Sequence, residues 1–136
     1  MNWLFKEEPS SYSFDQFAKD GSTTWSGVKN PLAQKHLRSV KKGDRVFYYH
    51  TGSERAVVGI ARATSDAYPD PKDESGKAVV VDIAPVRALP RPVGLSEIKA
   101  APGFAEFPLT RLPRLSVMPV SDNEWARIEK MSSKAT

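Results

Sequence analysis

Three runs of β-branched and aromatic residues follow one another between positions 44 and 86, and they constrain the fold more than any other feature. The runs are Asp44–His50 (DRVFYYH), Ala56–Ala63 (AVVGIARA) and Ala78–Val86 (AVVVDIAPV). Such residues favour strands because their side chains pack well on a pleated surface. Turn-forming residues separate the runs at 51–54 and in a loop over 66–76. The sequence therefore predicts a protein whose core is a sheet.

Two shorter segments extend the predicted sheet. Trp3–Lys6 alternates aromatic and aliphatic residues before a charge, which is typical of a short strand. Leu115–Val120 is typical of a closing strand, and Pro119 indicates a sheet edge because proline cannot donate a hydrogen bond to a neighbouring strand. For the same reason, we expect Pro90-Arg91-Pro92 to end the third of the central strands.

Helix-start signals predict several short helices outside the sheet. Ser13 with Gln16, and later Ser121 with Glu124, have the spacing of a capping box. Asn30, which precedes a proline, is a further start signal. The expected helices run from Ser13 to Gly21, from Asn30 to the Lys41-Lys42-Gly43 stop, over Ser96–Ala101, and onward from Ser121.

The length of the chain fits one domain, because 136 residues is close to the commonest domain size. We expect this domain to cover residues 1–131 and a frayed tail to cover residues 132–136. About five strands with short helices between them predict an α+β fold with a small, curved or barrel-like sheet and helices packed outside it.

Several functional classes lack the residues that they need. The chain has no cysteine and only two histidines, His36 and His50, so we expect no disulfide, no metal cluster and no cofactor. It carries no Gly-rich phosphate loop, nucleophile elbow or HExxH motif. The N-terminus has no long apolar run, so we expect no signal peptide or membrane span, and a cytoplasmic protein (nuclear if it comes from a eukaryote).

Positive charge gathers in one part of the sequence. The net charge is +4, which makes an anionic partner plausible. Only one acidic residue, Asp44, interrupts a basic stretch formed by Lys29, Lys35, Arg38, Lys41, Lys42 and Arg45. This stretch is either a solvated helix face or a phosphate-binding surface.

Nine aromatic residues lie in the first fifty positions, and most of them are expected in the core. Trp25 differs, because it lies in a predicted loop and has Thr24, Ser26 and Gly27 as neighbours. A loop tryptophan among small residues can serve as a stacking platform for a planar ring. His50 ends a strand, where it is either an ordinary polar strand end or a hydrogen-bonding group. Lys6, Glu8 and Thr51 would form an acid–base set if the fold brought them together.

An ordered set of motifs spans nearly the whole chain and resembles the EVE domain family. Each motif is weak alone, and the order makes the set specific. The motifs are Trp3-Leu4-Phe5-Lys6-x-Glu8-Pro9, Tyr12-Ser13, Trp25-x-Gly27-Val28-Lys29-Asn30, Ala33, Leu37-Arg38, Gly43-Asp44, Tyr49-His50, Gly59-Ile60-Ala61, Tyr68-Pro69-Asp70, Val81-Asp82 and Arg114-Leu115-Ser116-Val117 with Pro119-Val120.

The resemblance implies a PUA-like fold, a small mixed β-barrel of about five to six strands with flanking short helices. It also implies kinship with YTH domains, which cage a methylated adenine between tryptophans. By this kinship, the chain is a non-catalytic reader of a modified base, a cytosine or an adenine, in DNA or RNA. Trp25 then walls the base pocket, edged by Lys6, Glu7, Glu8, Ser26, Asn30 and His50, while the basic stretch holds phosphates. Trp25→Ala is expected to abolish binding and leave the fold intact.

Two other functions remain open at this point. One is a PUA-like hydrolase that uses Lys6 and Glu8 on a modified nucleoside, and the other is an interaction module whose basic stretch docks an acidic protein. The chain also departs from the family pattern near the expected pocket, at positions that bear on which base it prefers. The departures are Glu7 for a serine, Lys29 for an arginine, Pro31 for an aromatic residue, Thr51 for a serine, and Lys77-Ala78 where many relatives carry a tryptophan.

Overall fold

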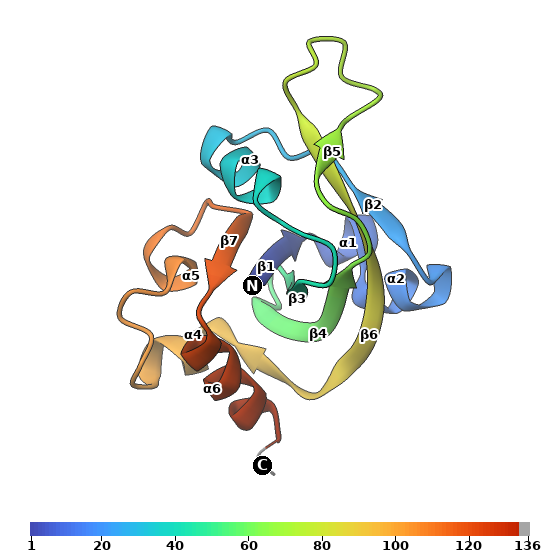
Figure 1. Cartoon of the computed structure of the whole chain (residues 1–136). Helices are drawn as coiled ribbons and strands as arrows, with labels where there is room; N and C mark the ends of the chain where they lie inside the picture. The colour runs from blue at the N-terminus through green and yellow to red at the C-terminus, as the bar shows by residue number, and fades with distance from the viewer. Residues whose placement is uncertain (134–136) are drawn as a thin grey trace.

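In a computed structural model of the protein, which describes residues 1–133, seven strands form a strongly curled mixed sheet with short helices around it (Figure 1). The strands are β1 (Asn2–Glu7), β2 (Thr23–Trp25), β3 (Arg45–His50), β4 (Ala56–Ala63), β5 (Tyr68–Pro69), β6 (Val79–Gly94) and β7 (Val117–Val120). The helices are α1 (Pro9–Tyr12), α2 (Phe14–Asp20), α3 (Pro31–Arg38), α4 (Leu95–Ala100), α5 (Pro108–Arg111) and α6 (Asp122–Ser133). The predicted α+β fold is confirmed, with more strands than the five to six expected.

The order of the strands is β2-β6-β4-β3-β1-β7, and β5 pairs with β6. β1 and β3 are parallel, with Asn2 opposite Arg45 and Glu7 opposite His50. The other pairs are antiparallel. β7 ends this order and pairs with β1, which confirms the edge strand that Pro119 indicated.

β6 is longer than predicted, because it continues through Pro90-Arg91-Pro92 to Gly94. Its register with β4 shifts between Val57, which faces Val93, and Gly59, which faces Ala88. The two prolines therefore lie in an irregular stretch of the pairing, where a missing backbone N–H breaks no regular ladder. The predicted break was wrong because a bulge accommodates both prolines.

Local helix signals were right about where most helices begin and less right about where they end. The capping box of α6 is complete, since Ser121 and Glu124 each accept a hydrogen bond from the other's backbone N–H. α3 ends at Arg38, before the predicted stop, and residues 41–44 form a turn instead. A further short helix, α1, covers Pro9–Tyr12, where no helix was predicted.

The C-terminal helix also runs further than expected. α6 includes Ser132 and Ser133, which were assigned to a frayed tail, and Ser132 is buried. The rest of that expected tail, residues 134–136, lies outside the described part of the chain. No helix within residues 1–133 is long and apolar enough to cross a membrane.

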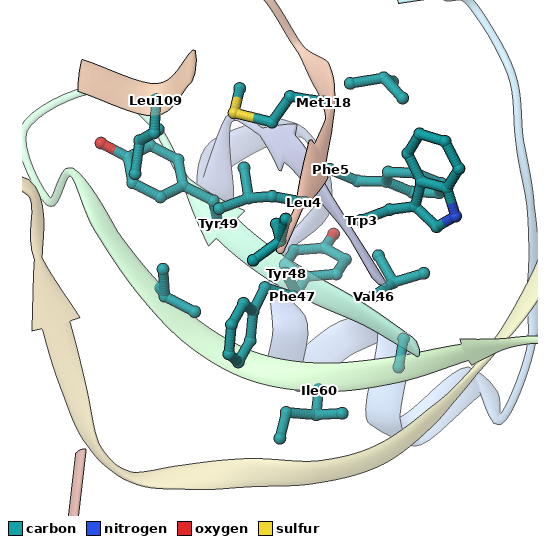
Figure 2. Close-up of a cluster of buried hydrophobic side chains, with 14 of the residues drawn as sticks. Trp3, Leu4, Phe5, Val46, Phe47, Tyr48, Tyr49, Ile60, Leu109 and Met118 are labelled. Carbon is teal, nitrogen blue, oxygen red and sulfur yellow. The ribbon is translucent and has the colours of Figure 1, made fainter. Parts of the chain in front are cut away.

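The core lies inside the curl of the sheet, where the side chains of β1 and β3 fill the space shown in Figure 2. α2 covers part of it with Phe14 and Phe17, which pack against Tyr48 of β3. Phe14 lies directly over Gly59 of β4, where an added Cβ would come within 2.6 Å of three ring carbons. Gly59 is therefore required for the close approach of α2 to the sheet.

Gly59→Ala is expected to lower the free energy of unfolding by about 1–3 kcal/mol, because the new methyl group displaces a buried ring. The matched control is Gly94→Ala, since its nearest atom, Arg55 O, is 4.0 Å away and its φ of −75° suits any residue. Urea denaturation of both variants checks this. Equal midpoints for the two would show that Phe14 does not depend on the glycine.

Asp44 joins the N-terminus to the turn before β3. Its carboxylate accepts hydrogen bonds from the N-terminal ammonium at 3.1 Å, the Trp3 indole at 2.9 Å and the Lys41 backbone N–H at 3.0 Å. Burial of this carboxyl opposes its ionisation, but the three donors outweigh burial and lower the pKa of Asp44 below its ordinary value. Asp44 therefore stabilises the fold as a carboxylate.

Because the pKa of Asp44 is lower in the folded protein, its stabilisation is fully present above the unfolded pKa of about 3.9 and is lost as the pH falls through the folded pKa. We expect Asp44→Asn to destabilise the protein by about 1–3 kcal/mol at pH 7 and the gap to the wild type to shrink below about pH 4. Urea midpoints at pH 7, 4 and 3 measure this, with the exposed Glu74→Gln as control. A gap independent of pH would contradict it.

Candidate nucleic-acid interface

The C-terminal end of β1 sends its last side chains to opposite faces of the sheet, as strand geometry requires. Glu7 shares its face with Phe5, which contacts Trp25. Lys6 lies over the Tyr49 ring at 5.7 Å and donates a hydrogen bond to Pro113 O at 2.9 Å. Burial lowers the pKa of Lys6. The two adjacent residues therefore belong to different surfaces.

Trp25 is not in a loop, which corrects the prediction from the sequence. It is the last residue of β2, faces Val81 of β6 and is only 6% exposed. Its ring centroid lies 5.3 Å from that of Phe5 and 5.5 Å from that of Tyr48, with the latter pair edge to face. Trp25 is therefore part of the core, and only a small part of its side chain reaches the surface.

That exposed part borders a small hollow of about 190 Å³, which we call the Trp25 hollow. Its lining residues are Glu7, Tyr12, Thr23, Thr24, Trp25 and Ser26. Glu7 Oε1 accepts the backbone N–H of Glu8 at 2.9 Å, whereas Glu7 Oε2 and the Trp25 indole N–H make no hydrogen bond within residues 1–133. The hollow is thus lined by a residue with a carboxylate acceptor and by a residue with an indole donor.

Tyr48 holds one side of the hollow in place. Its hydroxyl donates a hydrogen bond to the backbone carbonyl of Tyr12. Burial raises the pKa of Tyr48, and the nearby charges of Glu7 and Tyr12 raise it further. Tyr48 therefore remains a neutral donor, and Tyr12 keeps a fixed position at the rim.

Glu8 and His50 are not among the residues that line the hollow. Glu8 accepts a hydrogen bond from the Thr51 hydroxyl at 3.2 Å. His50 Nε2 accepts the backbone N–H of Phe14 at 3.0 Å, so its proton lies on Nδ1, which donates to Glu54 at 2.7 Å. Both ring nitrogens of His50 are thus used to position α2 and the turn after β3. Of the proposed acid–base set, Glu8 and Thr51 are in contact, while Lys6 bonds to Pro113.

Asn30 caps α3, since its side chain accepts the backbone N–H of Ala33 at 3.0 Å. It borders a second, mainly apolar hollow of about 300 Å³, which includes the exposed Leu32 and Leu112. Of the seven residues expected around the base, the structure therefore brings Glu7, Trp25 and Ser26 together and places the other four outside the Trp25 hollow.

The basic stretch does not form one surface. Lys29 and Arg38 line a groove of about 640 Å³ beside α3, and Lys35, Lys41 and Lys42 are exposed on α3 and the turn after it. Arg45 lies elsewhere, because its guanidinium stacks over Trp125 at 4.4 Å and its Nε donates to Asn2. Arg45 therefore contacts β1 and α6 and does not line the groove.

Some residues of this surface escaped the sequence analysis. Tyr12, Thr23 and Thr24 line the Trp25 hollow, and Lys72 and Lys77 line the groove. The β-branched pair before Trp25 is a strand signal that could have placed this segment in the sheet. No local signal marks the two lysines, because the loop that carries them meets α3 only in the folded chain.

Comparison with known proteins gives matches over nearly the whole chain. The model of the EVE domain family matches residues 1–131. Thymocyte nuclear protein 1 of Gallus gallus is 32% identical over an alignment of 158 positions, which covers 91% of this chain and 65% of that protein. The chain thus spans less than two thirds of that relative's length.

Two solved structures extend the match to three dimensions. A Rhodopseudomonas palustris protein is 44% identical, with a TM-score of 0.92 and coverage of 96% of this chain and 92% of the other. The human THYN1 protein, solved in complex with DNA that contains 5-methylcytosine, is 26% identical, with a TM-score of 0.90 and coverage of 99% of both chains. The fold of this chain is therefore that of these proteins.

The buried position of Trp25 changes the expected outcome of its removal. Trp25→Ala should lower the free energy of unfolding by about 3–5 kcal/mol, because it leaves a cavity between β1 and β3. Trp25→Phe keeps most of the ring packing and should lose much less. Thermal and urea denaturation of both variants measure this. An Ala variant as stable as the wild type would show that the Trp25 ring does not contribute to the core.

Proposed function

Because this chain belongs to the EVE domain family, we propose that it is a non-catalytic nucleic-acid-binding module that recognises a modified base in the Trp25 hollow. The observation that carries this proposal is one small hollow lined by both Glu7 and Trp25, whose Oε2 and indole N–H make no hydrogen bond in the described part of the chain. The human relative bound to DNA containing 5-methylcytosine makes that base in DNA the first ligand to test.

The chemistry of the hollow suits a pyrimidine with an exocyclic amine. Cytosine has an amine that donates hydrogen bonds, and carboxylates are among the groups that accept from it. Glu7 Oε2 would take this amine, while the Trp25 N–H and the Ser26 hydroxyl would donate to the ring's acceptors. The volume of about 190 Å³ favours one ring over the two of a purine.

The base has to leave its stack to reach this hollow. Extrusion of a base costs a few kcal/mol, and the binding site has to offset that cost. Hydrogen bonds to the charged Glu7 contribute about 1.5–3 kcal/mol each. Cationic side chains near the hollow add sequence-independent affinity for the phosphates.

A hydrolase built on Lys6 and Glu8 has less support. Glu8 is engaged by Thr51, and Lys6 donates to the Pro113 carbonyl on the other face of β1. Neither side chain lines the Trp25 hollow. Incubation of modified DNA and RNA oligonucleotides with the protein, followed by mass spectrometry, is expected to return them unchanged, and any altered nucleoside would favour the enzyme.

Glu7→Gln is expected to weaken binding of a 5-methylcytosine oligonucleotide by about 10- to 100-fold, because it removes a charged acceptor and changes little else. Fluorescence polarisation with methylated and unmethylated DNA and RNA oligonucleotides at fixed salt measures this. Glu106→Gln makes the same change at a glutamate 84% exposed near α5 and should bind as the wild type does. Equal affinities for the two variants would rule out a base at Glu7.

A further inference from the structure

A groove lies next to the Trp25 hollow, between α3 and the loop that joins β5 to β6. Figure 1 shows this loop extending beyond the sheet, with α3 close to its base. The groove has a volume of about 640 Å³. Gly27 and Val28 line it directly after Trp25 and Ser26, which line the hollow. The hollow and the groove are thus consecutive along one segment.

At one end of this groove, the Gln34 side chain bonds to the backbone of β6 where β2 no longer pairs with it. β2 pairs with β6 as far as Trp25 and Val81. Continued by two residues, this register would place Gly27 opposite Val79. Instead the Gln34 side chain accepts the Val79 N–H at 3.0 Å and donates to Val79 O at 3.3 Å and Val28 O at 2.7 Å. The buried amide thus joins Val28 to Val79 in place of a direct hydrogen bond between the two segments.

Cations face one another across the groove. Lys29 and Arg38 lie on the α3 side, and Lys72 and Lys77 lie on the loop. Arg38 also donates to Lys77 O at 2.6 Å, which joins the two walls. The four cations therefore line one groove whose two walls are joined by a hydrogen bond.

The two carboxylates of the groove accept hydrogen bonds from residues of the same loop. Asp70 accepts the Lys72 N–H at 2.9 Å, and Asp73 accepts the Ala78 N–H at 2.7 Å and hydrogen bonds from Ser75. Among the described lining residues, four cations face these two anions, so the groove carries a net positive charge.

We propose that this groove binds the sugar–phosphate backbone of one nucleic-acid strand, beside the base that enters the Trp25 hollow. The proposal rests on the proposed function, because it takes the strand to be the one that carries the recognised base. α3 has 8 residues and is thus about 12 Å long. At about 3.4 Å per stacked nucleotide, that length accommodates about three nucleotides. Adjacency to the hollow favours a nucleic-acid strand over an acidic peptide.

The test is the double substitution Lys72→Glu and Lys77→Glu, measured by polarisation with a single-stranded 5-methylcytosine oligonucleotide over a series of NaCl concentrations. Loss of two phosphate contacts should reduce the slope of log K against log salt by about 1.4 and weaken binding at least tenfold. The ratio of affinities for methylated and unmethylated strands should stay unchanged. Both lysines are exposed, and the melting temperature verifies that the variant folds.

The matched control is Lys99→Glu with Lys130→Glu, which makes the same charge change on α4 and α6, away from the groove. Identical slopes for the two double variants would overturn the proposal. Competition by polyglutamate that Lys72→Glu and Lys77→Glu abolishes, with nucleic-acid binding intact, would overturn it in favour of an acidic protein. Equal binding of methylated and unmethylated strands would contradict the proposed function but not this proposal. The salt slope would still measure whether phosphates bind in the groove.

Discussion

The parallel pairing of β1 with β3 is the constraint on which the rest of the structure depends. Parallel neighbours cannot be joined by a tight turn, so the chain between Glu7 and Arg45 has to return from one end of the pair to the other. That return contains α1, α2, β2 and α3. It also carries Trp25, Ser26 and the Lys29 and Arg38 side of the groove. The candidate interface is therefore built largely on a connection that the topology requires.

Sequence reasoning succeeded where structure is decided by neighbours in the chain. The Ala56–Ala63 run predicted β4 with its bounds, and the reciprocal bonds of Ser121 and Glu124 follow from a spacing of three residues. A resemblance of ordered motifs added the family, which composition and periodicity could not supply. The fold class followed from both.

Sequence reasoning failed where distant segments decide the outcome. Trp25 was expected at the surface, but Phe5 and Tyr48 bury it, and that contact exists only once β1, β2 and β3 meet. Glu7 and Lys6 are adjacent in sequence yet serve different surfaces, because a strand separates neighbours. His50 was expected at the base, but the backbone of Phe14 takes its free nitrogen. The sequence could thus predict which residues were candidates for the site. Only tertiary contacts decide which of them line the hollow.

The Gln34 amide affects the distance between the two parts of the candidate interface. Its planar group ties Val28 to Val79 at the start of β6, and it therefore helps to set the spacing between the Trp25 hollow and the cations of the loop. Under the proposed function, a strand whose base and neighbouring phosphates match that spacing would engage the hollow and the groove together, and a strand of different geometry would lose one of the two contacts.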